Sequence, residues 1–175
     1  MPSVAESIDM IREFLDTGGV VLNYIGVLIF IMWILILERI FYFKFFYKNY
    51  KKTIVKNWYG REERNSWNAE QIRIAIISRA KQSLNQSLPT IQAFVALCPL
   101  LGLLGTVTGM IEVFDVMAIS GSGNARSMAS GVSKATIPTM AGMVGALSGV
   151  FASTWLKRSS SREVELLEDK LLLDH

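Results

Sequence analysis

The sequence predicts an all-α membrane protein with three transmembrane helices per chain and long helical extensions on one side of the membrane. Of its 175 residues, 51% are hydrophobic and 19% are charged, whereas about a quarter of the residues of an ordinary soluble domain are charged. Three uncharged runs, 20–37, 90–111 and 135–156, contain eighteen to twenty-two residues each. A helix needs about 20 residues to cross the hydrocarbon core of a bilayer. The polar sequence that remains is too short to bury three such helices in a soluble protein.

The basic residues predict how the chain is oriented. Residues 38–89 hold eleven lysines and arginines and the tail from Lys157 holds four, against one in residues 1–19 and two in residues 112–134. Because Lys and Arg concentrate in cytoplasmic segments, we expect the N-terminus outside and both basic segments in the cytoplasm. Residues 1–19 lack a basic start and a small-residue cleavage site, so we expect no removable signal peptide.

Residues 1–19 are expected to form an amphipathic helix on the outer membrane face. Ser3 and Glu6 have the spacing of a capping box, and Gly18 and Gly19 are typical of a helix end. Apolar residues recur between them at helical spacing: Val4, Ile8, Ile11 and Leu15. A frayed tail is the alternative.

The first span, 20–37, has large lipid-suited side chains, and aromatic residues and lysines alternate in the cytoplasmic region 38–89 that follows it. Such residues are typical of a membrane interface with anionic lipid, and we favour this over nucleic-acid binding. The interfacial lysines are Lys44, Lys48, Lys51, Lys52 and Lys56. We expect this helix to end at Gly60, and a second cytoplasmic helix to begin with Asn68 as its cap and to bend at Pro89 before the second span.

The second and third spans, 90–111 and 135–156, carry small residues at helical spacing, which let membrane helices approach closely. The residues expected to pack helices are Pro99, Gly102, Gly105, Gly109, Gly142, Gly145 and Gly149. The third span has two such stripes, which we take to need neighbours on two sides and hence an oligomer, with spans two and three on its inside. Residues 112–134 are expected to hold a polar periplasmic turn and the start of the third helix, and residues 157–175 a cytoplasmic helical tail. Cys98 is expected to be a small buried residue.

Four hydroxyls are the candidate polar groups of the inner spans: Thr106, Thr108, Thr136 and Thr139. Each has the alternative of bonding to its own helix backbone. The three spans contain no Asp, Glu, His, Lys or Arg, so the chain alone lacks the titratable group of a proton relay. Either it carries no protons or a partner supplies the carboxylate. With one cysteine and one histidine, His175, the sequence predicts no metal site, no cofactor and no His-based triad, and we expect no enzyme.

Two motifs of the inner spans resemble the MotA/TolQ/ExbB proton channel family. Residues 99–109, PLLGLLGTVTG, are similar to the family's second span, and Gly131, Ala135, Thr139 and Gly142 match the start of its third. The short loop is most similar to short ExbB proteins. The resemblance implies a homopentameric ring in the bacterial inner membrane around single-span helices of an ExbD-like partner, whose intramembrane aspartate takes and releases protons.

The function implied by the resemblance is that of a proton-channel and stator subunit, which uses the proton motive force to energise TonB-dependent outer-membrane transport through a TonB-like protein. Thr106 and Thr139 match the family threonines, whose role is to hydrogen-bond the partner's aspartate or waters beside it. The alternatives are a TolQ-type subunit for envelope integrity and a membrane scaffold that conducts no ions.

One position departs from the family pattern. The family carries a glutamate five residues before the threonine of the third span, where this chain has Lys134, while Glu112 stands six residues after Thr106. At 1.5 Å per residue the two charges lie about 9 and 7.5 Å outside the threonines. We expect Glu112 and Lys134 to share one depth and to pair near the outer mouth, with two unrelated interface charges as the alternative.

Overall fold

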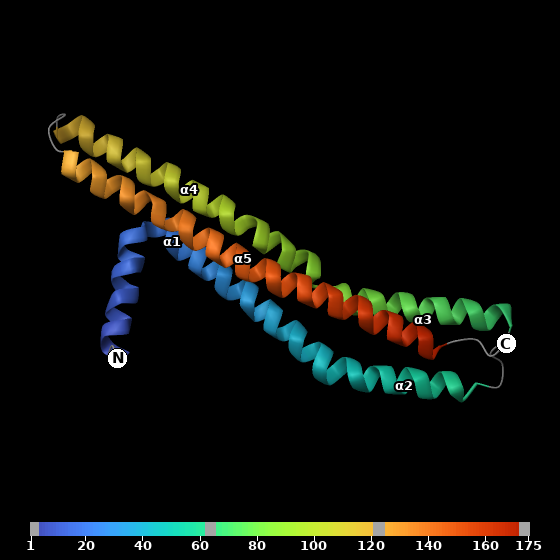
Figure 1. Cartoon of the computed structure of the whole chain (residues 1–175). Helices are drawn as coiled ribbons and strands as arrows, with labels where there is room; N and C mark the ends of the chain where they lie inside the picture. Colours follow the sequence, from blue (N-terminus) through green and yellow to red (C-terminus); the bar gives the residue numbers. More distant parts are fainter. Residues whose placement is uncertain (1–3, 62–65, 121–124, 172–175) are drawn as a thin grey trace. The chain divides into compact units, whose positions relative to one another are not determined.

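The structure is a computed structural model that describes residues 4–61, 66–120 and 125–171. This part of the chain is helical apart from short turns. The elements are α1 (Val4–Phe41), the π-helix η1 (Tyr42–Tyr47), α2 (Lys48–Tyr59), α3 (Trp67–Asn85), α4 (Leu88–Ser120) and α5 (Ala125–Lys170), all labelled or coloured along the chain in Figure 1. The expected Ser3 cap and most of the polar turn near residue 122 lie outside the described residues.

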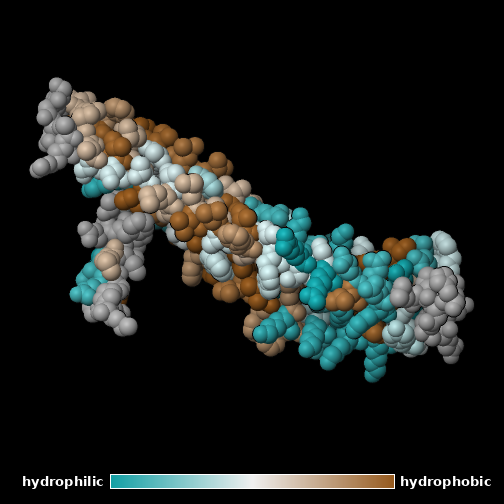
Figure 2. Space-filling model, viewed as in Figure 1, coloured by the Kyte–Doolittle hydropathy of each residue, from teal (hydrophilic) through white to brown (hydrophobic). Residues whose placement is uncertain are grey.

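Three helical stretches are long and apolar enough to cross a membrane: Gly18–Tyr59, Trp67–Ile119 and Met128–Lys170. Within their most apolar windows only 22%, 22% and 28% of the residues are buried by the chain itself. Most of this apolar surface therefore needs lipid or other chains to cover it. Figure 2 shows hydrophobic side chains over α4 and the middle of α5, and hydrophilic ones over α2 and the last part of α5.

The chain divides into two compact units. The first comprises Met1–Met32 with Ala93–Val150, and the second comprises Trp33–Gln92 with Phe151–His175. In the first unit, α1 changes direction at Gly19, whose φ of 68° and ψ of −166° are not helical. A residue that carries a side chain rarely adopts this positive φ. The helix break expected at Gly18 and Gly19 therefore lies at the second of these glycines.

The helix boundaries in the second unit follow the sequence except at one cap. The helix after the first span ends at Tyr59, with Gly60 as its C-cap, as expected. The cap of α3 is Ser66, whose hydroxyl accepts the backbone N–H of Ala69 at 3.2 Å, so the prediction of Asn68 was wrong. Both residues are good caps, but Asn68 lies inside the first turn.

A turn at residues 86–87 separates α3 from α4. Pro89 lies in the first turn of α4, where its missing N–H removes no helical hydrogen bond. Instead of the bend expected at Pro89, the helix is interrupted by this turn, two to three residues earlier.

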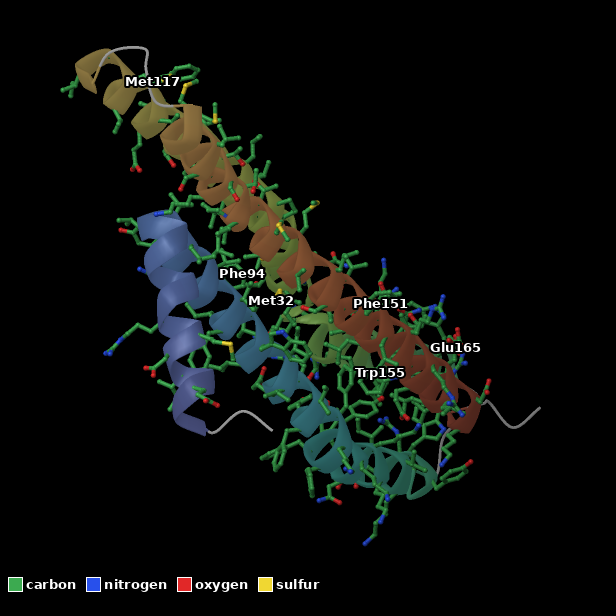
Figure 3. The ribbon with its side chains drawn as sticks, turned by 60° about the vertical axis from the view of Figure 1, so that its left-hand side comes forward. Met32, Phe94, Met117, Phe151, Trp155 and Glu165 are labelled. Carbon is green, nitrogen blue, oxygen red and sulfur yellow. The ribbon has the colours of Figure 1, made fainter. Side chains whose placement is uncertain are left out.

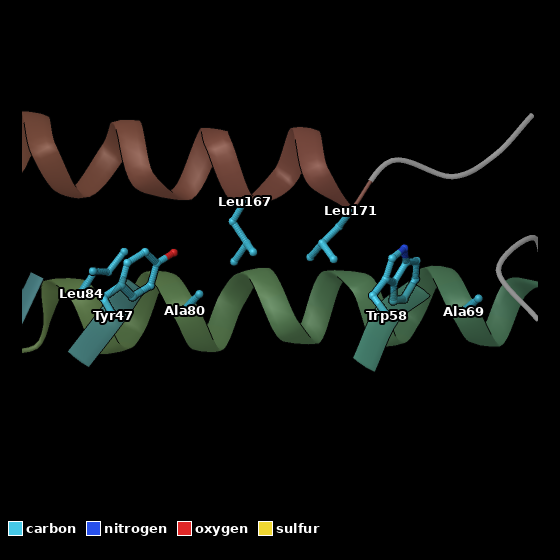
Figure 4. Close-up of a cluster of buried hydrophobic side chains, with 7 residues drawn as sticks. All are labelled: Tyr47, Trp58, Ala69, Ala80, Leu84, Leu167 and Leu171. Atoms are coloured by element: carbon cyan, nitrogen blue, oxygen red, sulfur yellow. The ribbon is translucent and has the colours of Figure 1, made fainter. Parts of the chain in front are cut away.

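The core of the second unit forms where three helices meet. Its buried side chains, drawn in Figure 4, come from η1 and α2, from α3, and from α5 and the residue that directly follows it: Tyr47, Trp58, Ala69, Ala80, Leu84, Leu167 and Leu171. Ala80 and Leu84 lie four residues apart and so form a buried stripe on one face of α3. This stripe packs against Tyr47 and Trp58. The sequence indicated only a membrane interface for these two aromatic residues, and not a buried core.

Candidate functional site: a hydroxyl pair between two closely packed helices

The first unit brings α4 and α5 together through glycines. The two helices run antiparallel, because Gly109, Gly102 and the backbone at Cys98 meet Ala135, Thr139 and Gly142 in reverse order. A methyl group added at Gly102 would lie 2.9 Å from Cα of Thr139, and one added at Gly142 would lie 2.5 Å from the carbonyl oxygen of Cys98. Both obstacles are backbone, so only glycine permits this separation.

The same close approach brings Thr106 and Thr139 together. Their hydroxyl oxygens are in hydrogen-bond contact across the two helices. Both also lie within reach of one acceptor, the carbonyl oxygen of Gly102, at 3.2 Å from Thr106 Oγ1 and 2.8 Å from Thr139 Oγ1. The side chains are half-buried. The structure thus joins the two threonines and the carbonyl group of Gly102 in one polar cluster between the helices.

This cluster has fewer protons than hydrogen bonds. Each threonine hydroxyl has a single O–H donor, while the geometry offers three contacts. When Thr106 donates to Thr139, Thr139 donates to the carbonyl of Gly102. When Thr139 donates to Thr106, Thr106 donates to the carbonyl of Gly102. Two proton arrangements therefore satisfy the same heavy-atom positions, and either hydroxyl can turn outward while the other keeps the carbonyl bonded.

Thr108 and Thr136 bond within their own helices. Thr108 donates to the carbonyl oxygens of Leu104 or Gly105, at 3.0 and 3.1 Å. Thr136 donates to the carbonyl oxygen of Ser133 at 2.7 Å and is exposed. For these two hydroxyls the structure has the local bonding that was the alternative to a lumen-lining role.

A cavity of about 590 Å³ lies beside the last part of α4, the first part of α5 and the Gly19 bend of α1. Glu112 and Lys134 both line it, together with Thr108 and Ser130. Pro138 also lines it, and because proline has no N–H, the carbonyl of Lys134 lacks its helical partner there. The expected shared depth of the two charges agrees with this common cavity, but among the described residues they form no ion pair.

The two small stripes of α5 face different helices of the same chain. Gly142 packs against α4, whereas an added methyl group at Gly145 would overlap Ile29 of α1. At Gly149 it would lie 2.7 Å from the sulfur of Met32, which Figure 3 labels on α1. Three helices of one chain therefore supply neighbours for both stripes, so the stripes do not by themselves require an oligomer, and the oligomer stays a prediction.

The remaining packing residues lie where the sequence suggested. Gly105 and Gly109 face Pro138 and Ala135 of α5. Cys98 is fully buried, as expected. Pro99 is half-buried inside α4.

The interfacial lysines line a second cavity, of about 680 Å³, in the second unit. Lys44, Lys48, Lys52 and Lys56 are exposed, while Lys51 is held by Glu163 of α5, with 2.9 Å between Nζ and Oε2. The sequence did not suggest this contact across 112 residues. The sequence analysis also missed the π-helix η1, because the only local feature of this segment is a run of aromatic residues after the first span.

A polar contact joins the end of the first span to α3. Tyr42 and Ser83 share a hydrogen bond of 2.6 Å between hydroxyl oxygens, and Arg39 donates to the carbonyl oxygen of Ser83 at 3.2 Å. Arg39 is buried. A buried arginine needs such partners, and here they connect the last turn of α1 to α3 within the second unit.

Among the residues that the structure describes, no group of three His, Cys, Asp or Glu side chains is placed to hold a metal ion.

Comparison with known proteins assigns the family. A family model described as the MotA/TolQ/ExbB proton channel family matches residues 42–169. "Putative biopolymer transport protein ExbB-like 1" of Synechocystis sp. is 40% identical over 78 residues, which are 43% of this chain and 31% of that protein. "Biopolymer transport protein exbB1" of Vibrio cholerae is 33% identical over 96 residues, 54% of this chain and 42% of that protein.

The chain therefore spans less than half the length of these relatives, and no solved structure matches it. The family match itself includes α4, all of α5 except its last residue, the threonine pair and most of the second unit. With its three apolar helices, the chain is a membrane protein that belongs to the MotA/TolQ/ExbB proton channel family and is similar to its ExbB-like members.

Proposed function

We propose that this chain forms the wall of a proton channel and the stator of an energy-coupling motor in the bacterial inner membrane. Five copies surround the single-span helix of an ExbD-like partner with an intramembrane aspartate. The N-terminus is periplasmic and the C-terminus cytoplasmic. Proton flow through this assembly energises a TonB-like protein and transport across the outer membrane. The chain itself has no enzymatic role and binds no cofactor.

The observation that carries the proposal is the hydroxyl pair of Thr106 and Thr139. It is a polar cluster between two helices whose apolar runs contain no charged residue. Because either hydroxyl can turn outward while the other keeps the Gly102 carbonyl bonded, the pair can donate to a partner carboxylate at little cost. The threonines orient the carboxylate and its waters and do not titrate.

An uncovered apolar surface supports assembly with further chains. Met140, Val144 and Leu147 of α5 are 63%, 68% and 60% exposed, one helical turn apart. Leu103 and Val107 of α4 are similarly open. This surface stands beside the hydroxyl pair, where the proposed ring places neighbouring copies and the partner helix.

The outer cavity supplies water access from the periplasmic side in this proposal. Two of its lining residues, Gly105 and Pro138, directly precede Thr106 and Thr139. Glu112 and Lys134 then set the charge at the cavity's wall, where one carboxylate and one ammonium group attract water without adding net charge. We expect Glu112→Gln to lower the conduction rate and leave assembly unchanged.

The test is proton conduction by proteoliposomes that contain the chain and its co-expressed partner. Thr106→Val and Thr139→Val each leave one hydroxyl to bond the Gly102 carbonyl, so both should fold and assemble. Each should reduce proton flux at least tenfold, in line with the loss of a positioned donor. The matched control is Thr53→Val. The exposed side chain of Thr53 bonds to the carbonyl oxygen of Asn49 in its own helix, so this variant should conduct protons at the normal rate.

Normal flux in both inner-span variants would refute a proton path at the hydroxyl pair and favour the non-conducting scaffold. Native mass spectrometry of the assembly provides the second readout. Five copies with a small single-span protein support the motor, and the identity of that protein separates a TonB system from a TolQ-type system for envelope integrity.

A further inference from the structure

A groove in the second unit carries a concentration of positive charge that channel function does not explain. Ten residues line its volume of about 680 Å³, and six of them are lysines: Lys44, Lys48, Lys51, Lys52, Lys56 and Lys170. Five come from η1 and α2. Lys170 comes from the end of α5, more than a hundred residues away in the sequence. The fold therefore gathers these ammonium groups around one space.

The charge of the groove is not neutralised by the part of the chain that the structure describes. Within that part, Glu163 is the only acidic residue that lines the groove, and it is already paired with Lys51. For the other five lysines, no acidic residue of the described chain lies within ion-pair distance. Five ammonium groups around one groove repel one another, and an anion of multiple charge relieves that repulsion.

The floor of the groove is apolar and fixed. Phe43 and Val55 line it with Tyr47, whose side chain is 1% exposed and belongs to the hydrophobic core of the unit. Tyr47 donates its hydroxyl proton to the carbonyl oxygen of Glu163 at 3.5 Å. Burial and the charge of Glu163 raise the pKa of Tyr47 to about 12, so the phenol stays neutral at physiological pH. The groove thus has a rigid wall for the uncharged part of a ligand and a cationic rim.

We infer that this groove is a binding site for an anion that carries phosphate groups, with the phosphates held by Lys44, Lys48, Lys52, Lys56 and Lys170. Lysine is a point-charge donor that suits phosphate oxygens. Lys51, fixed by Glu163, holds the helices that form the groove and is not a primary ligand.

The position of the groove along the helix admits two sources of the phosphate. Lys44 lies seven residues past Leu37, where the first apolar run ends, which is about 10 Å of helix. Lys56 lies nineteen residues past it, about 28 Å. The Lys44 end is therefore at the depth of lipid headgroups, and the Lys56 end is in the aqueous phase. An anionic phospholipid enters from the first end and a soluble polyphosphate from the second.

The test uses the full-length chain with three groove lysines neutralised, Lys44→Gln/Lys48→Gln/Lys52→Gln. The matched control is Arg79→Gln/Lys81→Gln/Arg162→Gln, which removes three exposed bases at similar distances from the apolar runs. Lys51 is unchanged in both, so that its ion pair with Glu163 keeps the helices together. A Lys→Arg version of the groove triple retains the charge and should retain binding.

Two arms distinguish the sources. In the lipid arm, the chain is taken from bilayers of phosphatidylcholine and phosphatidylglycerol in equal amounts, and native mass spectrometry counts the retained anionic lipid. In the soluble arm, calorimetry measures the binding of inorganic pyrophosphate to the chain in nanodiscs of phosphatidylcholine alone. We expect binding in at least one arm, with a loss of about tenfold or more in the groove triple and less than about twofold in the control.

Binding in the lipid arm alone identifies a headgroup site, and binding in the soluble arm identifies a polyphosphate site. An equal loss in the groove and control variants would reduce the effect to diffuse attraction and overturn the inference. So would no specific binding in either arm. A groove triple that binds both probes normally but loses ring assembly would assign these lysines to contacts between chains instead. None of these outcomes depends on proton conduction.

Discussion

The closeness of α4 and α5 makes Gly102 the position at which a single methyl group should have the clearest effect. In Gly102→Ala the new Cβ would lie 2.9 Å from Cα of Thr139, 3.1 Å from the carbonyl oxygen of Pro138 and 3.4 Å from that of Thr139. All three atoms are backbone, so no side-chain rotation relieves the contact. The helices must separate by several tenths of an ångström.

The size of the effect follows from a comparison with Gly26→Ala. Gly26 also lies in an apolar helix, and a Cβ added there would meet nothing within 4 Å. Both substitutions gain about 1 kcal/mol of helix propensity, and this gain cancels in the difference between them. The remaining difference is the overpacking at Gly102, about 1–3 kcal/mol. Gly102→Ala should therefore be the less stable variant by that amount.

Titration with SDS in bicelles, followed by circular dichroism, measures the free energy of unfolding of both variants. Proton flux in proteoliposomes is the second readout, because a wider helix separation also stretches the contact between Thr106 and Thr139. Equal stability of Gly102→Ala and Gly26→Ala would show that α4 and α5 are not in backbone contact at this level. The reasoning for the hydroxyl pair would then lose its geometric basis.

Three further predictions concern the second unit. Leu167→Ala should cost about 2–5 kcal/mol in a thermal or denaturant transition because Leu167 is fully buried, whereas Leu166→Ala, at a position 39% exposed, should stay within about 0.5 kcal/mol. Ser160→Ala removes the donor to Asn85 Oδ1, 2.8 Å away, and should cost about 1–3 kcal/mol; an unchanged midpoint would contradict a buried bond. Since the folded state holds the pKa of Tyr47 at about 12, above the ordinary 10.0, stability is full below pH 10 and falls as the pH rises towards 12. Tyr47→Phe should flatten the pH dependence of the unfolding midpoint in that range, and an unchanged slope would contradict it.

The features that depend on composition and local spacing could be predicted from the sequence. Long uncharged runs predicted three membrane-spanning helices, and those helices are present. Gly19 and Gly60 end helices for conformational reasons that act on a single residue. The glycines of the two inner spans also predicted close packing, because small residues at helical spacing have few other uses in a membrane.

The features that depend on which faces meet could not be predicted in this way. Two small stripes on α5 indicated two neighbours, but only the fold shows that Gly142 faces α4 and Gly145 faces α1. The ion pair of Lys51 and Glu163 joins residues that no local pattern connects. The sequence predicted the N-cap of α3 two residues too late. Ser66 and Asn68 have similar preferences for the N-cap position, and only the structure shows that the helix begins after Ser66.

The proton arrangement at Thr106 and Thr139 limits what this chain can contribute to energy coupling. Two hydroxyl protons are shared among three contacts around the Gly102 carbonyl. The pair can therefore switch between two hydrogen-bond arrangements without moving a heavy atom. A hydroxyl that neither gains nor loses a proton transfers no net charge, however, and the apolar runs hold no Asp, Glu, His, Lys or Arg. Net flux must therefore follow protonation of a group that another chain supplies. Proteoliposomes with this chain alone should hold a pH gradient, and those that also contain a partner with an intramembrane carboxylate should dissipate it. Dissipation by the chain alone would place a proton path in spans that have no carboxylate, and would refute the division of roles between the two proteins.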